Sequence, residues 1–375
     1  MREIYLDYNA STPIDAAVAV AMQPFLETAF GNPSSPHWAG RPAKAALEQA
    51  RSQVASLLGA EADEIVFMSG GSEANNLALK GAAWALKAKG DHIITSMIEH
   101  PSVLEPCRFL GDLGFRISLV PVDRTGRVDP DDVRRAITPK TILVSIMHAN
   151  NEVGTIQPIE ELSQITRAHG FLLHTDAAQS VGKIATNVST LGVDLLTVAG
   201  HKLYAPKGIG ALYVRRGTPL EPLIHGAGHE RGRRAGTESA LLAVGLGAAC
   251  DLARELAPMK RVRALRDRFW HGLKARFGDG VVLNGHPEHR LPNTLNVSFV
   301  GRIGAEILAQ LDGVAASTGS ACHAGRVELS SVLKAMQVAQ EVGMGAIRFS
   351  LGRGTTQDDI DAVLDRLACV LAAAS

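Results

Sequence analysis

The segments TILVSI (residues 141–146) and FLLHTD (residues 171–176) are short runs of apolar and β-branched side chains, and a segment with helical periodicity separates them. Five similar runs occur in the same part of the chain, at residues 65–68, 92–95, 117–120, 195–198 and 211–214. Strands that alternate with helices are typical of an α/β layered domain, and nearly continuous apolar strands are buried on both faces. The sequence therefore predicts a doubly wound, seven-stranded, mainly parallel sheet with helices on both sides.

Two of the intervening helices have a glycine at their predicted end. Residues 42–58 are followed by Gly59, and residues 72–89 are followed by Gly90. Glycine is common directly after the last helical residue because it adopts a left-handed backbone conformation without strain. We therefore expect two helices over these ranges, each closed by its glycine.

The pattern changes at about residue 258. A long charged helix is followed by a strand at 294–298, a helix at 304–311, a strand at 346–350 and a closing helix at about 356–374. The sequence thus predicts a large domain at residues 15–257 and a smaller α+β domain at residues 258–375, joined by the N-terminal segment 1–14. No low-complexity linker separates the two, so we expect them to pack closely.

Composition excludes several classes of protein. The 375-residue chain has 38 Lys and Arg against 38 Asp and Glu, so it has no general attraction for nucleic acid or an anionic membrane. The four cysteines are far apart and form no C-x-x-C pair, which favours a reducing compartment over disulfides or a zinc knuckle. The longest uncharged apolar stretch, residues 239–250, is too short to span a bilayer. We expect a cytoplasmic protein without nucleic-acid or membrane partners.

The segment SGGSEANN (residues 69–76) follows a predicted strand and opens a helix. Its two glycines let the backbone approach an anion, while Ser72 and the free N–H groups of the helix supply donors. The segment is a candidate phosphate site, with an ordinary capped turn as the alternative. It matches neither the P-loop nor the dinucleotide fingerprint.

Two other strand ends carry ionisable residues. Asp176 ends an apolar strand, where a carboxylate needs a donor such as a protonated ring nitrogen, although it could also be a helix N-cap. Lys202, after Gly200 and His201, follows another strand. A lysine that is desolvated among other cations can lose its proton and attack a carbonyl group, whereas the alternative is a surface lysine.

A fourth segment, ASTGSACHAG (residues 316–325), places Cys322 beside His323 in a loop of small residues. An accessible loop cysteine is a candidate nucleophile. The other cysteines, Cys107, Cys250 and Cys369, lie in apolar helical patterns, and we expect all three to be buried.

Taken together, these segments resemble the cysteine desulfurase family, the pyridoxal-phosphate enzymes of aminotransferase class V, over essentially the whole chain. The resemblance rests on LDYNAST (6–12), GNPSS (31–35), SIMHANNE (145–152), GHK (200–202), RAGTE (234–238) and IRFSLGR (347–353). It implies fold type I of the pyridoxal-phosphate-dependent transferases. It also implies conversion of L-cysteine to L-alanine, with the sulfur transferred to Cys322 as a persulfide and passed on to an acceptor protein.

The resemblance implies roles for individual residues as well. Lys202 would bind the cofactor, His100 would stack on its ring, Asp176 would pair with the ring nitrogen, and Gln179 would reach the ring hydroxyl. The residues implied to bind the cofactor are Gly71, Ser72, Asn151, Asp176, Gln179, His201, Lys202 and, from the second subunit of a homodimer, Thr237. The residues implied to contact the substrate are Arg348, Asn9 and His37.

The sequence departs from the family pattern in three places. Ala199 stands where many relatives have serine, which removes one phosphate hydroxyl. His323 stands where many have threonine or serine, and the resulting Ala-Cys-His pattern is similar to that of selenocysteine lyases, so release of selenium from selenocysteine is the alternative activity. Relatives that serve iron–sulfur scaffolds extend past their last helix, whereas this sequence ends at Ser375, so we do not expect the same docking.

Two other functions have less support in the sequence. A nicotinamide-dependent oxidoreductase would need a Gly-rich strand-to-helix fingerprint that the sequence lacks. A metal site could use the pairs His286 and His289 or His225 and His229, but neither pair has a cysteine or acidic residue at ligand spacing. We expect loop histidines and no metal.

Overall fold

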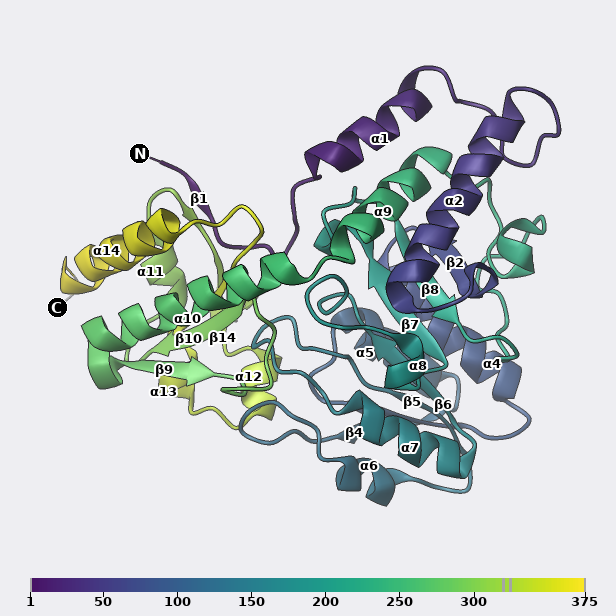
Figure 1. Cartoon of the computed structure of the whole chain (residues 1–375). Helices are drawn as coiled ribbons and strands as arrows, with labels where there is room; N and C mark the ends of the chain where they lie inside the picture. Colours follow the sequence, from purple (N-terminus) through teal and green to yellow (C-terminus); the bar gives the residue numbers. More distant parts are fainter. Residues whose placement is uncertain (1, 319–320, 324–325, 374–375) are drawn as a thin grey trace.

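The computed structural model describes residues 2–318, 321–323 and 326–373; of residues 321–323, 326, 327 and 373 it describes the backbone only. Figure 1 shows two lobes linked by the long helix α10 (Ala257–Phe277). The larger lobe is built on a seven-stranded sheet with the order β2-β8-β7-β6-β5-β3-β4. Its strands are β2 (Ile65–Met68), β3 (His92–Ser96), β4 (Arg116–Val120), β5 (Thr141–Ser145), β6 (Leu172–Asp176), β7 (Leu195–Ala199) and β8 (Gly210–Val214).

Strand β8 runs antiparallel to both of its neighbours, β2 and β7, whereas the other neighbouring strands are parallel. The predicted seven-stranded, mainly parallel sheet is therefore confirmed. The bounds of the observed strands differ from the predicted ones by no more than two residues.

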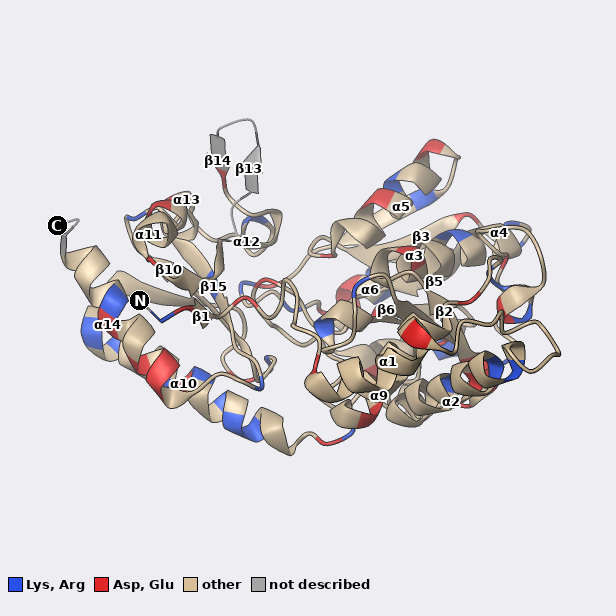
Figure 2. Ribbon diagram, turned by 90° about the horizontal axis from the view of Figure 1, so that it is seen from above, with Lys and Arg blue, Asp and Glu red and all other residues tan. Residues whose placement is uncertain are grey.

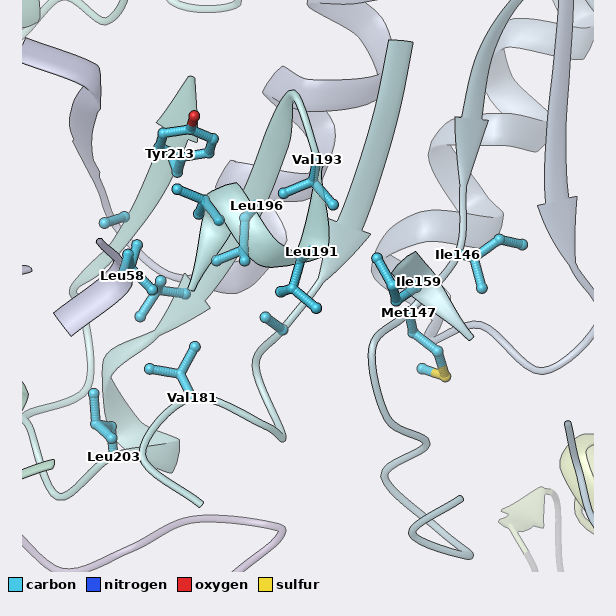
Figure 3. Close-up of a cluster of buried hydrophobic side chains, with 14 of the residues drawn as sticks. Leu58, Ile146, Met147, Ile159, Val181, Leu191, Val193, Leu196, Leu203 and Tyr213 are labelled. Atoms are coloured by element: carbon cyan, nitrogen blue, oxygen red, sulfur yellow. The ribbon is translucent and has the colours of Figure 1, made fainter. Parts of the chain in front are cut away.

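Alternate side chains of each strand face opposite sides of this sheet, as the period of two requires. In β2, Ile65 and Phe67 belong to one buried cluster, and Val66 and Met68 belong to another. Figure 3 shows part of the first cluster, in which Leu58, Leu191 and Leu196 come from different elements. Helices that contribute to the first cluster are α1 (Ala16–Glu27), α2 (Gly40–Leu58), α6 (Pro130–Ala136), α7 (Ile159–His169), α8 (Val188–Leu191), α9 (Ala240–Ala253) and, from the other lobe, α12 (Ser331–Ala335). Helical segments that contribute to the second are α3 (Gly71–Asn76), η2 (Leu77–Gly81), α4 (Ala82–Leu86) and α5 (Pro101–Asp112).

The two predicted helix ends behave differently. Helix α2 ends at Gly59, which has a left-handed backbone (φ 67°), as predicted. The helix expected at 72–89 is instead divided, because the π-helical segment η2 separates α3 from α4, and α4 ends at Leu86. Gly90 is not a left-handed cap; its backbone passes so close to the residue before β5 that a Cβ atom would lie 2.2 Å from the carbonyl oxygen of Lys140.

The smaller lobe contains a second, antiparallel sheet with the order β12-β15-β10-β9. Its strands are β9 (Val281–Asn284), β10 (Thr294–Phe299), β12 (Ser317–Thr318) and β15 (Ala346–Ser350), and its helices are α11 (Gly304–Gln310), α12 (Ser331–Ala335), α13 (Gln340–Gly343) and α14 (Gln357–Ala373). Two short pairs complete it: β1 (Ile4–Tyr5) with β11 (Val314–Ala315), and the backbones of β13 (Ala321–His323) and β14 (Arg326–Glu328). The buried cluster of this lobe includes Ile4 and Leu6, so the start of the chain packs here.

The prediction for the cysteines is confirmed for Cys107 and Cys250, which are buried, and is wrong for Cys369, which is exposed on α14. The buried face of α14 is formed by Ile360, Val363, Leu364 and Leu367. Position 369 lies two residues beyond Leu367, about 200° further around the helix, so its side chain points to the opposite side.

Helix α10 is mostly basic and α14 is mostly acidic, and the two helices lie side by side (Figure 2). Ion pairs join them, from Arg268 to Asp361 and from Arg276 to Asp365. In the part of the chain that the structure describes, no helix combines the length and apolar character needed to cross a membrane.

Candidate active site

A cavity of about 350 Å³ opens at the carboxyl ends of the parallel strands, where an α/β sheet places its ligands. Chain segments that follow β2, β3, β5, β6 and β7 meet there with the N-terminal segment and β15. Its lining residues are Asn9, Ala10, Gly71, Ser72, Asn75, His100, Ser102, Met147, Ala149, Asn151, Asp176, Ala178, Gln179, Ala199, His201, Lys202 and Arg348. The fold thus brings most of the predicted site residues together from distant parts of the sequence.

Lys202 enters the cavity from the single-turn helix η3 (Gly200–Lys202), directly after β7. Its Nζ donates to the backbone carbonyls of Asn9 and Ala10, the latter at 2.7 Å. Burial, together with the nearby guanidinium of Arg348, lowers the pKa of Lys202 to about 8. A neutral amine is therefore accessible near physiological pH, which is the property a carbonyl-binding lysine needs.

Asp176, at the end of β6, is 7% exposed and has both carboxylate oxygens held. Its Oδ1 accepts the backbone N–H of Ala178 at 2.9 Å, and its Oδ2 accepts the side-chain amide of Asn75 at 2.7 Å. The carboxylate is thus fixed in orientation at the edge of the cavity. It has lone pairs left for a further donor, such as a protonated ring nitrogen.

Gln179 is held at both ends of its amide. Its Oε1 accepts from Nζ of Lys183 at 3.0 Å, and its Nε2 donates to the carbonyl of Asn9 at 3.0 Å. Burial, with a smaller effect from Lys202, lowers the pKa of Lys183 to about 7. The Nε2 of Gln179 has a second proton, which can bind a ligand.

His100 is the N-cap residue of α5 and lines the cavity. Its Nδ1 lies 2.8 Å from the hydroxyl of Ser102 and 3.1 Å from the backbone N–H of the same residue. Desolvation lowers the pKa of His100, and the charge of Lys202 adds to that effect while Asp176 opposes it.

The candidate phosphate side of the cavity is formed by Gly71, Ser72 and His201. Gly71 and Ser72 begin α3, as the sequence predicted for a helix-opening segment, and Ser72 is exposed. Burial and the neighbouring Lys202 lower the pKa of His201 to about 4, so its imidazole is neutral and can donate one N–H.

Arg348 reaches the cavity from β15 and is already partly engaged. It donates to the carboxylate of Asp7 at 2.7 Å and to the backbone carbonyl of Asn151 at 3.1 Å. Its Nε has no hydrogen-bond partner within the described residues, although it is buried. Asn151 lines the cavity and contributes this carbonyl.

Asn9 lines the cavity, but its side chain is used inside the protein. Its amide nitrogen donates to Thr294 at 2.9 Å and to the carbonyl of Asn151 at 3.1 Å, and its oxygen accepts from Asn293 at 2.9 Å. At 1% exposure it offers a substrate little beyond its backbone carbonyl, which binds Lys202 and Gln179.

Two predicted residues do not line this cavity. His37 is exposed in the loop between α1 and α2, and Thr237 is exposed at a separate cavity that also contacts Arg234. The side chain of Cys322 lies outside the described residues, although its backbone belongs to β13.

The loop that carries Thr237 is fastened to the large lobe by two ion pairs. Arg51 and Glu230, both buried, are joined at 2.7 Å, and Arg234 binds Glu73 of α3 at 2.9 Å. The second pair connects this loop directly to the helix that begins with Gly71 and Ser72.

Sequence reasoning missed Asn75, Ser102 and Lys183. Lys183 stands four residues after Gln179 in sequence, a spacing that allows contact across a turn. Asn75 stands one helical turn after Ser72, so its position on α3 could have been noticed, but its partners Asp176 and Ser102 could not.

Among the residues that the structure describes, no group of three or more His, Cys, Asp and Glu is placed to hold a metal ion. The rings of His286 and His289 lie 4.7 Å apart, between centroids, without a third such residue beside them.

Comparison with known proteins agrees with this architecture. The family model for aminotransferase class-V matches residues 4–363. A protein of Dictyoglomus turgidum named cysteine desulfurase IscS is 52% identical over 374 residues, which cover 99% of this chain and 95% of that protein. A solved NifS-like protein superposes with a TM-score of 0.93 at 38% identity and 99% coverage of both chains.

A second solved structure, described as SspA in complex with cysteine, has a TM-score of 0.84 at 38% identity and covers 94% of this chain and 100% of its own. The matches extend through both lobes and include every segment that lines the cavity. The chain belongs to the aminotransferase class-V family, among its members named cysteine desulfurases.

Proposed function

We propose that the protein is a pyridoxal-phosphate-dependent cysteine desulfurase, which converts L-cysteine to L-alanine and transfers the sulfur to Cys322 as a persulfide. The observation that carries the proposal is the shared cavity of Lys202, an amine with a lowered pKa, and Asp176, a buried carboxylate with free lone pairs. The relative from Dictyoglomus turgidum is named a cysteine desulfurase, which does not favour the selenocysteine lyase alternative.

The cavity fits pyridoxal phosphate in size and in its donor set. Its volume of about 350 Å³ lies at the small end of the range for ligand pockets. Lys202 would hold the aldehyde, Asp176 the ring nitrogen and the second Nε2 proton of Gln179 the phenolic oxygen, while Ser72 and His201 would hold the phosphate. When bound, the cofactor supplies an aldehyde that captures the substrate amine and a ring that withdraws electrons from it.

The chain's own residues bind and orient the substrate. Arg348 lines the cavity and presents a guanidinium, whose fork geometry suits the substrate carboxylate. The carboxylate of Asp7 keeps this guanidinium in place at 2.7 Å. Lys202, with a pKa of about 8, can hold or release a proton at Nζ close to neutral pH.

Sulfur transfer requires no external oxidant. The thiolate of Cys322 attacks the substrate sulfur, a sulfur–sulfur bond forms, and the carbon–sulfur bond breaks with its electron pair left on carbon. That carbon takes up a proton and becomes the methyl group of alanine. An acceptor protein or a thiol then removes the outer sulfur from Cys322.

We propose further that the active unit is a cytoplasmic homodimer of subunits divided near residue 257 into two domains. Thr237 and His37 lie outside the cavity of their own chain, so an adjacent subunit could use them. Helix α1 and the loop after it expose four large apolar side chains, which form a surface suited to burial in such an interface. These are Val20, Leu26, Phe30 and Trp38.

Reduction with borohydride followed by peptide mapping tests the cofactor assignment. The cofactor-loaded protein should carry a pyridoxyl group on Lys202, and Lys202→Ala should carry none. Lys89→Met, which changes an exposed lysine, serves as the control and should be labelled like the wild type. A label on another lysine, or no label at all, would contradict the proposed function.

A further inference from the structure

A continuous hydrogen-bonded bridge connects the two residues that flank the proposed cofactor ring. It runs from the carboxylate of Asp176 through Asn75 and Ser102 to the imidazole of His100. The heavy-atom distances along it are 2.7, 2.8 and 2.8 Å. Asn75 comes from α3, Ser102 from α5 and Asp176 from β6, so only the folded chain brings the bridge together.

The orientation of the Asn75 amide follows from its partners. A single atom, Nδ2, is within hydrogen-bond distance of both Asp176 Oδ2 and Ser102 Oγ. Since the carboxylate only accepts, the nitrogen must face it, and a flipped amide would place two acceptors together. The Oδ1 of Asn75 is left buried without a partner in the described residues, at a cost that the two donated bonds offset.

The direction of the next hydrogen bond follows in turn. The hydroxyl of Ser102 accepts a hydrogen bond from Nδ2 of Asn75, so its own single proton is available for another acceptor. Nδ1 of His100 is that acceptor at 2.8 Å, and the backbone N–H of Ser102 points at the same Nδ1 from 3.1 Å. Two donors aimed at one ring nitrogen require that this nitrogen carries no proton.

We propose that Asn75 and Ser102 are positioning residues that fix His100 as the neutral tautomer protonated on Nε2 and hold the Asp176 carboxylate in place. The imidazolium form would add a proton to Nδ1 and break both bonds from Ser102. The proposal rests on the proposed function in one respect: the oriented Nε2–H and the oriented carboxylate serve a cofactor ring between them. The lowered pKa of His100 is consistent with it.

The tautomer can be measured without any cofactor. The full-length protein, labelled with [15N]histidine, gives ring nitrogen shifts that separate protonated from unprotonated nitrogens, and His100→Gln assigns the His100 signals. The wild type should show one His100 tautomer, protonated on Nε2. In Ser102→Ala the protonated fraction of His100 at about pH 6 should rise about three- to tenfold, the scale of one lost hydrogen bond.

Matched variants separate this effect from a general disturbance. Ser118→Ala removes a hydroxyl that lies 2.9 Å from Nε2 of another histidine, His92, and should leave the His100 signals unchanged. Ser102→Thr keeps the hydroxyl and should restore the wild-type tautomer. Unchanged His100 titration in a folded Ser102→Ala protein, or a wild-type His100 protonated on Nδ1, would overturn the proposal.

The other half of the bridge is tested by the affinity for pyridoxal 5′-phosphate. Asn75→Leu leaves Asp176 Oδ2 without its donor, so the dissociation constant should rise about tenfold or more, as for a lost bond to a charged group. Gln310→Leu, which changes an exposed amide at the end of α11 in the smaller lobe, should bind like the wild type. Equal affinity of Asn75→Leu and wild type would overturn the role of Asn75. If the wild type itself failed to bind pyridoxal 5′-phosphate, the proposed function would be wrong. The tautomer measurement would still test the roles of Asn75 and Ser102, because it needs no cofactor.

Discussion

The two ends of the candidate active site are built in different ways. On the ring side, a single chain joins Asp176, Asn75, Ser102 and His100 in one network and ties Gln179 to a buried lysine. On the phosphate side, Ser72 is exposed, and Thr237 belongs to another cavity.

This difference indicates which parts of the site a single subunit can complete. Groups that select the orientation of a flat ring need fixed directions, and buried hydrogen bonds supply them. Groups around a phosphate need mainly donors and a positive field, which another subunit can add. The loop that carries Thr237 is fastened by the ion pair between Arg234 and Glu73, so it is positioned rather than loose.

The largest expected effect comes from breaking the ring side at its centre. Asp176→Asn keeps the size of the side chain but removes the charge that stabilises a protonated ring nitrogen. We expect turnover of cysteine to fall on the order of 10²- to 10³-fold, the scale of losing one electrostatic group at a reacting centre. Initial rates of alanine formation measure it. The control is Asp129→Asn, which changes an exposed helix N-cap where either residue is suitable. Near-normal turnover of Asp176→Asn would refute the proposed role of the ring side.

A smaller effect on activity is expected at Lys183, which donates a hydrogen bond to the cavity residue Gln179. Lys183→Met leaves the oxygen of Gln179 without its donor, and kcat/KM for cysteine should fall about tenfold, the upper range for one hydrogen bond. An unchanged kcat/KM would show that Lys183 does not orient the amide.

Stability gives a second, independent readout for the same variant. The ordinary lysine pKa of 10.5 applies to the unfolded chain, whereas the folded pKa of Lys183 is lowered to about 7. Between these values the unfolded chain binds a proton that the folded one does not, so this group makes the free energy of unfolding rise with pH. The rise should be weaker in cofactor-free Lys183→Met than in Lys89→Met, as measured by urea unfolding between about pH 7 and about pH 10. Equal slopes would contradict the lowered pKa.

The smallest effect is expected on the phosphate side. Thr237→Val removes one hydroxyl, and the dissociation constant for pyridoxal 5′-phosphate should rise about threefold. Mixed dimers sharpen the comparison. A subunit with Thr237→Val, paired with a Lys202→Ala subunit, should bind cofactor at its own Lys202 with wild-type affinity, because the hydroxyl comes from the neighbour. Weakened binding in that mixed dimer would show that Thr237 acts within its own chain.

The sequence allowed the sheet and much of the cavity to be predicted, because apolar strands and the polar residues at their ends leave local patterns. Asp176 and Lys202 are such residues. The partners of those residues could not be predicted in this way. Asn75 and Ser102 bind across elements, and their distance depends on how α3 and α5 pack on the sheet.

Local patterns also failed where packing decided the outcome. The helix expected at 72–89 had suitable residues throughout, yet a π-helical segment interrupts it. At Gly81 the segment that contains Glu221 passes so close that a Cβ atom would lie 2.6 Å from the carbonyl oxygen of Glu221. Cys369 lies in an apolar stretch but on the outer side of α14, which only the packing of that helix reveals.

The most direct test of the proposed desulfurase activity is the fate of sulfur after one turnover with L-cysteine. Cofactor-loaded protein, mixed with cysteine, alkylated and analysed by peptide mass spectrometry, should carry one extra sulfur atom on Cys322 and release one alanine for each sulfur bound. Cys322→Ala should form no persulfide, and it should form alanine more slowly than the wild type. Persulfide on another cysteine, or undiminished desulfuration by Cys322→Ala, would contradict the account.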